Sequence, residues 1–104
     1  MDIRKKQIEL ILDKIQDAVD LFYQQNNVEA FEKFGNIIED MTNAVDMLAS
    51  YKNEYSEFEM DEAKICGILN EAMEALEAGD TILMADIIQY DFVEYISDLL
   101  IDME

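Results

Sequence analysis

The sequence predicts an all-α fold, an antiparallel up-down-up-down four-helix bundle that forms one domain over residues 1–104. Hydrophobic side chains recur every three or four residues in four stretches of similar length, which is the spacing of one helix face. No proline interrupts these stretches. Two of the three connections between them are short, and short connections make consecutive helices antiparallel.

The first predicted helix covers about residues 2–25. Its apolar face is broad, as suits a helix packed between two neighbours, and consists of Ile8, Ile11, Leu12, Ile15, Ala18, Val19 and Phe22. The segment Gln24-Gln25-Asn26-Asn27 then breaks the pattern. Asn suits both the left-handed residue after a helix and the N-cap of the next helix, so we expect a tight helical hairpin here.

The second predicted helix, about residues 28–50, has the most regular pattern. Its expected buried seam, spaced alternately by three and four residues, is Phe31, Phe34, Ile38, Met41, Val45 and Leu48, widened by Ala30, Ile37 and Ala44. Gly35 lies inside this helix at a cost of about 1 kcal/mol relative to alanine. Either a neighbouring backbone approaches closely at Gly35, or the helix tolerates the cost.

The third predicted helix covers about residues 57–78. Ser56-Glu57-Phe58-Glu59 has the form of a capping box, in which the hydroxyl and the last carboxylate each bond a backbone amide. Gly79 suits the position just after the helix, where a left-handed residue is common. The residues expected to face inward are Phe58, Ile65, Leu69, Ala72 and Leu76.

The fourth predicted helix, about residues 81–103, follows a short hairpin and is capped by Asp80 or Thr81. Its expected inward stripe is Ile82, Ala85, Ile88, Phe92, Tyr95 and Leu99, with Leu83, Ile87, Val93, Ile96 and Leu100 beside it. An antiparallel bundle brings the start of the first helix to the end of the fourth. We therefore expect charge pairs between the basic set Arg4, Lys5 and Lys6 and the acidic set Asp98, Asp102 and Glu104.

The sequence contains no recognisable catalytic or metal-binding pattern. There is no histidine and the apolar stripes contain almost no glutamate, which disfavours a dinuclear metal centre of the helical-bundle type. No segment has the ligand spacing of an EF-hand. Cys66 has no basic partner that would activate a thiolate, so we interpret it as a small buried or half-buried structural residue. We expect no enzyme activity, cofactor or metal.

The charge of the chain is unusual. Twenty-five acidic residues against seven basic ones give a net charge of −18, which disfavours nucleic acid and anionic membranes and favours a cationic partner. From residue 65 to 104 there are ten acidic residues and no Lys or Arg. The sequence has a single cysteine and no run long enough to span a bilayer. We therefore expect a soluble cytoplasmic protein.

The candidate partner-binding residues lie on the fourth predicted helix. They are Asp86, Gln89, Tyr90, Asp91, Glu94 and Asp98. Asp86 and Gln89 occupy a largely apolar stripe, so they lie either at the mouth of a binding groove or at a rim where they bond a neighbouring helix or water.

Part of this helix resembles a C-terminal segment that recurs in small helical proteins of Gram-positive bacteria. The resemblance covers about 16 residues and rests on Leu76, Asp80, Leu83-Met84-Ala85-Asp86-Ile87-Ile88 and Tyr90-Asp91. The layout of the whole chain is similar to that of flagellar export chaperones of the flagellin-binding type. That resemblance implies a small helical bundle that holds a helix of its export substrate in an apolar groove.

Together these observations favour a non-enzymatic, acidic protein-interaction module, which acts as a chaperone or adaptor and binds a basic or amphipathic helix of a partner protein. The alternative is a structural homodimer whose broad apolar stripes also form the dimer interface and whose acidity serves solubility.

Overall fold

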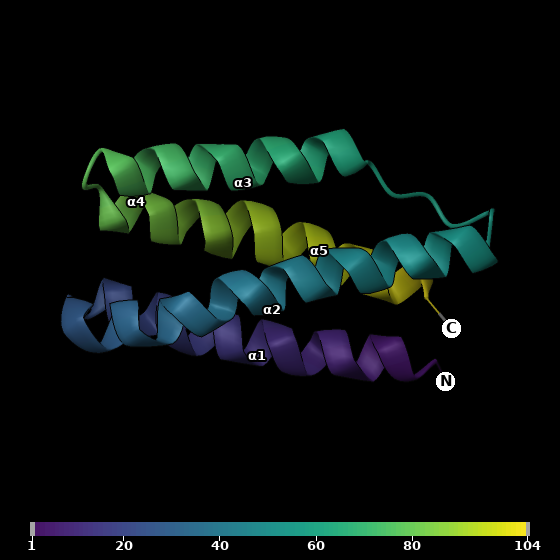
Figure 1. Ribbon diagram of the computed structural model, residues 1–104, viewed down its shortest axis with the longest axis horizontal. Helices are drawn as coiled ribbons and strands as arrows, with labels where there is room; N and C mark the ends of the chain where they lie inside the picture. The colour runs from purple at the N-terminus through teal and green to yellow at the C-terminus, as the bar shows by residue number, and fades with distance from the viewer. Residues whose placement is uncertain (1, 104) are drawn as a thin grey trace.

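The computed structural model describes residues 2–103, and its helices alternate in direction along the chain (Figure 1). The last helix is continuous but changes its winding in the middle. No strand occurs within the described residues, so the predicted all-α bundle is confirmed. The elements are α1 (Ile3–Tyr23), α2 (Asn27–Glu54), α3 (Glu62–Glu77) and a C-terminal helix formed by α4 (Thr81–Asp86), η1 (Ile87–Val93) and α5 (Glu94–Asp102).

The four helices do not contribute equally to the packing. Helix α1 packs along α2 and also against α4 and η1, while α3 packs against α4 and η1. Helices α2 and α3 form no extended contact of this kind. The molecule measures 40 × 24 × 18 Å. Two hairpins, α1–α2 and α3 with the C-terminal helix, are therefore joined mainly through α1.

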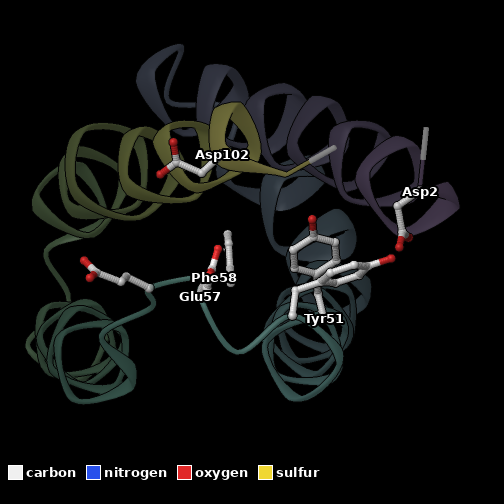
Figure 2. Close-up of a pocket in the computed structure, with 7 residues that line it drawn as sticks. Asp2, Tyr51, Glu57, Phe58 and Asp102 are labelled. Atoms are coloured by element: carbon white, nitrogen blue, oxygen red, sulfur yellow. The ribbon is translucent and has the colours of Figure 1, made fainter.

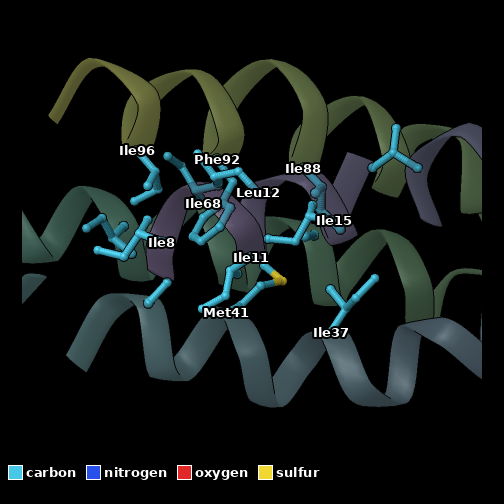
Figure 3. Packing of buried hydrophobic residues seen from close by; sticks show 14 of the residues in the cluster. Ile8, Ile11, Leu12, Ile15, Ile37, Met41, Ile68, Ile88, Phe92 and Ile96 are labelled. Atoms are coloured by element: carbon cyan, nitrogen blue, oxygen red, sulfur yellow. The ribbon is translucent and has the colours of Figure 1, made fainter. Parts of the chain in front are cut away.

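The core confirms the predicted apolar face of α1 in full. The seven predicted side chains are buried, and no polar or charged residue is buried in the described part of the chain. In Figure 3, Ile8 and Ile15 of α1 lie between Phe92 of the C-terminal helix and Met41 of α2. At the far end of α1, the ring of Phe22 meets Phe31 and Phe34 edge to face, with centroids 5.2 and 5.8 Å apart.

The buried seam of α2 is rotated from the predicted one. Phe34, Met41 and Leu48 are buried as expected, but the prediction was wrong for Phe31 and Ile38, which are 44% and 43% exposed. Ala30, Ile37 and Ala44, which were expected to widen the seam, are buried as predicted, Val45 is half-buried, and Tyr51 extends the seam beyond the predicted residues. Alanine lets the α1 and α2 backbones come close together, and this contact fixes which side of the helix is buried. An alanine side chain at Gly35 would have no atom within 4 Å, so that glycine is tolerated rather than required by a neighbour.

Both predicted short connections, between α1 and α2 and between α3 and α4, are present. After α1 the left-handed residue is Gln25, with φ 59°, and not an asparagine as predicted, while the Asn26 amide donates to the Leu21 carbonyl at 3.0 Å. Asn26 is the N-cap of α2, but its side chain makes no capping hydrogen bond. After α3, Gly79 takes the same conformation with φ 77°, and the Asp80 carboxylate accepts from the Leu83 amide. These bonds satisfy the backbone groups that a helix end leaves unpaired.

Helix α3 begins five residues later than predicted, at Glu62, so the predicted capping box at Ser56 was wrong. The cap is Asp61, whose carboxylate accepts from the Lys64 amide at 3.0 Å. Phe58 and Met60 are buried while Glu59 between them is exposed, which is the alternation of an extended segment. The connection places the side chains of Phe58 and Met60 in the end of the core, and α3 begins only after it.

The C-terminal helix contains a wide π-type turn, η1, over Ile87–Val93. Ile88, Phe92 and Ile96 are buried and recur every four residues, whereas an α-helix repeats every 3.6. A wider turn offsets this mismatch and keeps the three side chains on one face. The expected stripe was therefore wrong at Tyr95, which is half-buried, and also at Ile82, which is exposed.

Arg4 forms ion pairs and a hydrogen bond at the end of the bundle, but its partners differ from the predicted ones. Its guanidinium bonds Asp2 at 2.7 Å and Glu54 of α2 at 2.6 Å, and it donates to the Ser50 hydroxyl at 3.0 Å. Lys5 reaches the end of the C-terminal helix by donating to the Met103 carbonyl at 3.3 Å. The predicted pairs of Arg4, Lys5 and Lys6 with Asp98 and Asp102 are not formed, and Glu104 lies outside the described residues.

The cluster at Arg4 predicts a specific acid sensitivity. Hydrogen bonds from the Arg4 side chain and amide lower the pKa of Asp2 from 3.8 to about 2. The contribution of this carboxylate to stability is therefore fully present above pH 3.8 and is lost as the pH falls toward 2. We expect Asp2→Asn, which retains an N-cap side chain, to lower the melting temperature at pH 6 but to match the unchanged protein at the acid end of this window. A constant difference across a pH series of thermal melts would contradict this assignment.

Candidate interaction surface

A groove runs between α3 and the C-terminal helix on the side that carries most of the predicted partner-binding residues. Its hollow has a volume of about 370 Å³. The hollow is lined by Lys64, Ile68, Tyr90, Asp91, Glu94, Tyr95 and Asp98. Three carboxylates thus stand on the C-terminal helix, facing a wall that α3 provides.

Tyr95 fixes the geometry of this groove. Its hydroxyl accepts a hydrogen bond from the Asp61 amide at 3.0 Å, which ties the start of α3 to α5. The ammonium of Lys64 lies 4.5 Å from the centre of the Tyr95 ring, within the range of a cation–π contact. The groove therefore already holds one cation against an aromatic ring beside its carboxylates.

The groove continues toward the end of the bundle. A second hollow of about 890 Å³ shares Tyr95 and Asp98 with the first and extends past Phe58 and Asp102. Its other lining residues are Lys52, Ser56, Glu59, Met60, Asp61, Glu62 and Leu99. We call these two hollows together the acidic groove, because seven carboxylates line them against two lysines.

The structure divides the six predicted residues into two sets. Tyr90, Asp91, Glu94 and Asp98 come together in the acidic groove. Asp86 lies instead at the junction of α1 and α4, where its carboxylate accepts a hydrogen bond from the Tyr23 hydroxyl at 2.6 Å. Gln89 is half-buried, and its Oε1 atom has no hydrogen-bond partner within the described residues.

The contact between Tyr23 and Asp86 is a tie between helices. Burial at the junction, and then the hydrogen bond to Asp86, raise the pKa of Tyr23 well above its usual range. The phenol therefore keeps its proton and continues to donate at any ordinary pH. Of the two readings left open for Asp86, the structure shows the bond to a neighbouring helix.

One protein-family model matches most of the chain. It is described as a domain of unknown function (DUF8042) and matches residues 5–101. The chain belongs to this family. No curated protein and no solved structure matches it. The matched range of the DUF8042 domain contains all the residues of the first hollow of the acidic groove, whereas Asp2, Arg4 and Asp102 lie outside it.

In this DUF8042 domain, three residues of the first hollow of the acidic groove were missing from the predicted site. Lys64 and Ile68 come from α3, and Tyr95 had been assigned to the core stripe. The sequence contains no local signal for the first two, because their role depends on which side of α3 faces the C-terminal helix. For Tyr95, the four-residue repeat of Ile88, Phe92 and Ile96 is a usable signal, since it assigns the buried position to Ile96.

Between residues 2 and 103, no three acidic or cysteine side chains are grouped so that they could hold a metal ion. Cys66 is exposed, rather than buried or half-buried as expected. None of the helices described here is both long and apolar enough to cross a membrane.

Proposed function

We propose that this protein is a non-enzymatic, cytoplasmic interaction module that holds a basic amphipathic helix of a partner protein in the acidic groove. The observation that carries the proposal is the juxtaposition of Asp91, Glu94 and Asp98 with the apolar and aromatic surface of Ile68 and Tyr90 in one hollow. An amphipathic helix offers both complements, an apolar stripe and a flanking row of Lys or Arg.

The spacing of the carboxylates supports a helical ligand. Asp91, Glu94 and Asp98 are three and four residues apart, so they form one row along the helix edge. A partner helix lying alongside can place basic residues at the same interval. Extended peptides place alternate side chains on opposite faces and match such a row less well.

The field of the whole protein supports the same choice. A net charge of −18 attracts a cationic segment from a distance and accelerates encounter at low salt. The interaction would be that of a chaperone or adaptor, as the resemblance of the sequence layout to that of flagellin-type export chaperones implies. Membership in DUF8042 neither adds an activity to this proposal nor removes one.

The test uses a defined ligand, a synthetic helix of leucine and lysine with one apolar face. The triple variant Asp91→Lys, Glu94→Lys and Asp98→Lys is expected to weaken its binding at least about tenfold in 150 mM salt, because each exposed ion pair contributes up to about 1 kcal/mol. Fluorescence anisotropy of the labelled peptide measures the affinity. A scrambled peptide of equal charge, without an apolar face, reports attraction by charge alone.

The matched control reverses Glu9, Asp13 and Asp17 on the outer side of α1. Each replacement changes the charge by two, so both triple variants go from −18 to −12. Equal weakening by the two variants would show that the groove is not the binding site.

The alternative function, a structural homodimer, is favoured by a different observation. Val28, Phe31 and Ile38 leave apolar surface exposed on α2, a helix that has no extended contact with α3. Sedimentation equilibrium distinguishes the two functions. A dimer that persists at low concentration and dissociates in the variant Phe31→Ser/Ile38→Ser would favour the structural function.

A further inference from the structure

A further hollow of about 750 Å³ adjoins the second hollow of the acidic groove, at the end of the bundle where both described ends of the chain meet the α2–α3 connection. Figure 2 shows its walls, with Asp2 from the N-cap of α1, Asp102 from the C-terminal helix, Tyr51 from α2, and Glu57 and Phe58 from the connection. Tyr55 and Glu59 complete the lining. We call this the end hollow. No lysine lines it, in contrast to both parts of the acidic groove.

Aromatic rings form one wall of the end hollow. The ring of Tyr51 is 4.5 Å from that of Tyr55 and 5.0 Å from that of Phe58, measured between centroids. Tyr51 and Phe58 are buried, but Tyr55 is 51% exposed and offers ring surface to a ligand. The face of an aromatic ring attracts cations, and more strongly where water is partly excluded.

The position of Arg4 shows that the aromatic wall of the end hollow accepts a cation. Its guanidinium lies 5.3 Å from the centre of the Tyr51 ring while the Asp2 carboxylate holds it at 2.7 Å. One ring and one carboxylate of the hollow are thus already occupied by a cation. Within residues 2–103, the carboxylates of Glu57, Glu59 and Asp102 form no ion pair.

The arrangement of these carboxylates distinguishes between kinds of cation. No three acidic side chains in the described chain are grouped closely enough to hold one metal ion, so a compact divalent cation has no suitable site here. A ligand with several ammonium groups separated by methylene chains fits separated carboxylates. Its methylenes can also pack on the exposed ring of Tyr55.

We propose that the end hollow binds a linear aliphatic polyamine. One ammonium lies over the Tyr55 ring, and the others pair with Glu57, Glu59 and Asp102. The end hollow shares Phe58, Glu59 and Asp102 with the second hollow of the acidic groove, but Tyr55 and Glu57 line the end hollow alone, and Asp91, Glu94 and Asp98 line only the groove. A failure to bind a polyamine would therefore leave the proposed binding of a partner helix unaffected.

The test is an isothermal titration of spermidine into the full chain at 150 mM NaCl. Glu57→Gln/Glu59→Gln is expected to weaken binding about tenfold, since it removes two carboxylates from the hollow. Tyr55→Leu is expected to weaken it about threefold, which corresponds to an exposed cation–π contact, while Tyr55→Phe retains the affinity. Because Tyr55 is half exposed, both of its variants keep the core intact, and circular dichroism checks this.

The control Glu9→Gln/Asp13→Gln changes the net charge equally, from −18 to −16, but at residues of α1 that do not line the hollow. Its spermidine affinity should stay within twofold of that of the unchanged protein. Equal loss in the two double variants, or full affinity in Tyr55→Leu, would overturn the proposal and leave only general attraction to an acidic protein.

Discussion

Replacing Phe22 with alanine is expected to lower the free energy of unfolding by about 3–5 kcal/mol, a large part of the stability of a domain of this size. Phe22 is 1% exposed and its ring packs edge to face against Phe31 and Phe34. The substitution removes both ring contacts and leaves a cavity where α1 meets the start of α2. Urea unfolding followed by circular dichroism measures the change.

Val28→Ala provides the control for this experiment. Val28 is 78% exposed on the neighbouring turn of α2, so the same kind of truncation there should change stability by less than about 0.5 kcal/mol. A cost at Phe22 no greater than that at Val28 would show that this end of the bundle is not packed as described.

Deleting Tyr90 from η1 is expected to leave the protein folded. The deletion shortens the interval between Ile88 and Phe92 from four residues to three, and a regular α-helix then keeps Ile88, Phe92 and Ile96 on one face. The wide turn behaves in this respect as a single inserted residue. Cooperative thermal unfolding and a dispersed amide NMR spectrum are the expected results.

Deleting Gln16 from α1 is the matched control and should unfold the protein. Removal of one residue from a regular α-helix rotates everything after it by about 100°, which turns Val19 and Phe22 out of the core. If the Tyr90 deletion were equally disruptive, the π-type turn would not be an insertion that the flanking helices absorb.

The sequence was sufficient to predict α1 because that helix packs between α2 and the C-terminal helix. Its buried face is broad, so an error of one position in the pattern would still select core residues. The prediction for α2 was less accurate because two overlapping sets share Phe34, Met41 and Leu48. The choice between Ala30 and Phe31 depends on how closely α1 approaches, and hydrophobicity alone favours the larger side chain.

The candidate site was predicted only in part, because the sequence does not show which element each side chain contacts. The absence of basic residues after Lys64 identified Asp91, Glu94 and Asp98, which do lie together. Asp86 has the same charge and lies on the same helix, but it faces α1 and bonds Tyr23. Charge distribution along a chain identifies an acidic helix, whereas the neighbour of each carboxylate follows only from the packing of the bundle.

The joining of the two hairpins mainly through α1 has a consequence for how the chain folds. Each hairpin consists of helices adjacent in sequence, so its contacts close short loops at little entropic cost. The contacts of α1 with α4 and η1 are the ones that must bring distant parts of the chain together. We therefore expect docking of the two hairpins along α1 to limit the folding rate, and we expect the two hairpins to exchange their amide hydrogens as separate units when the molecule opens.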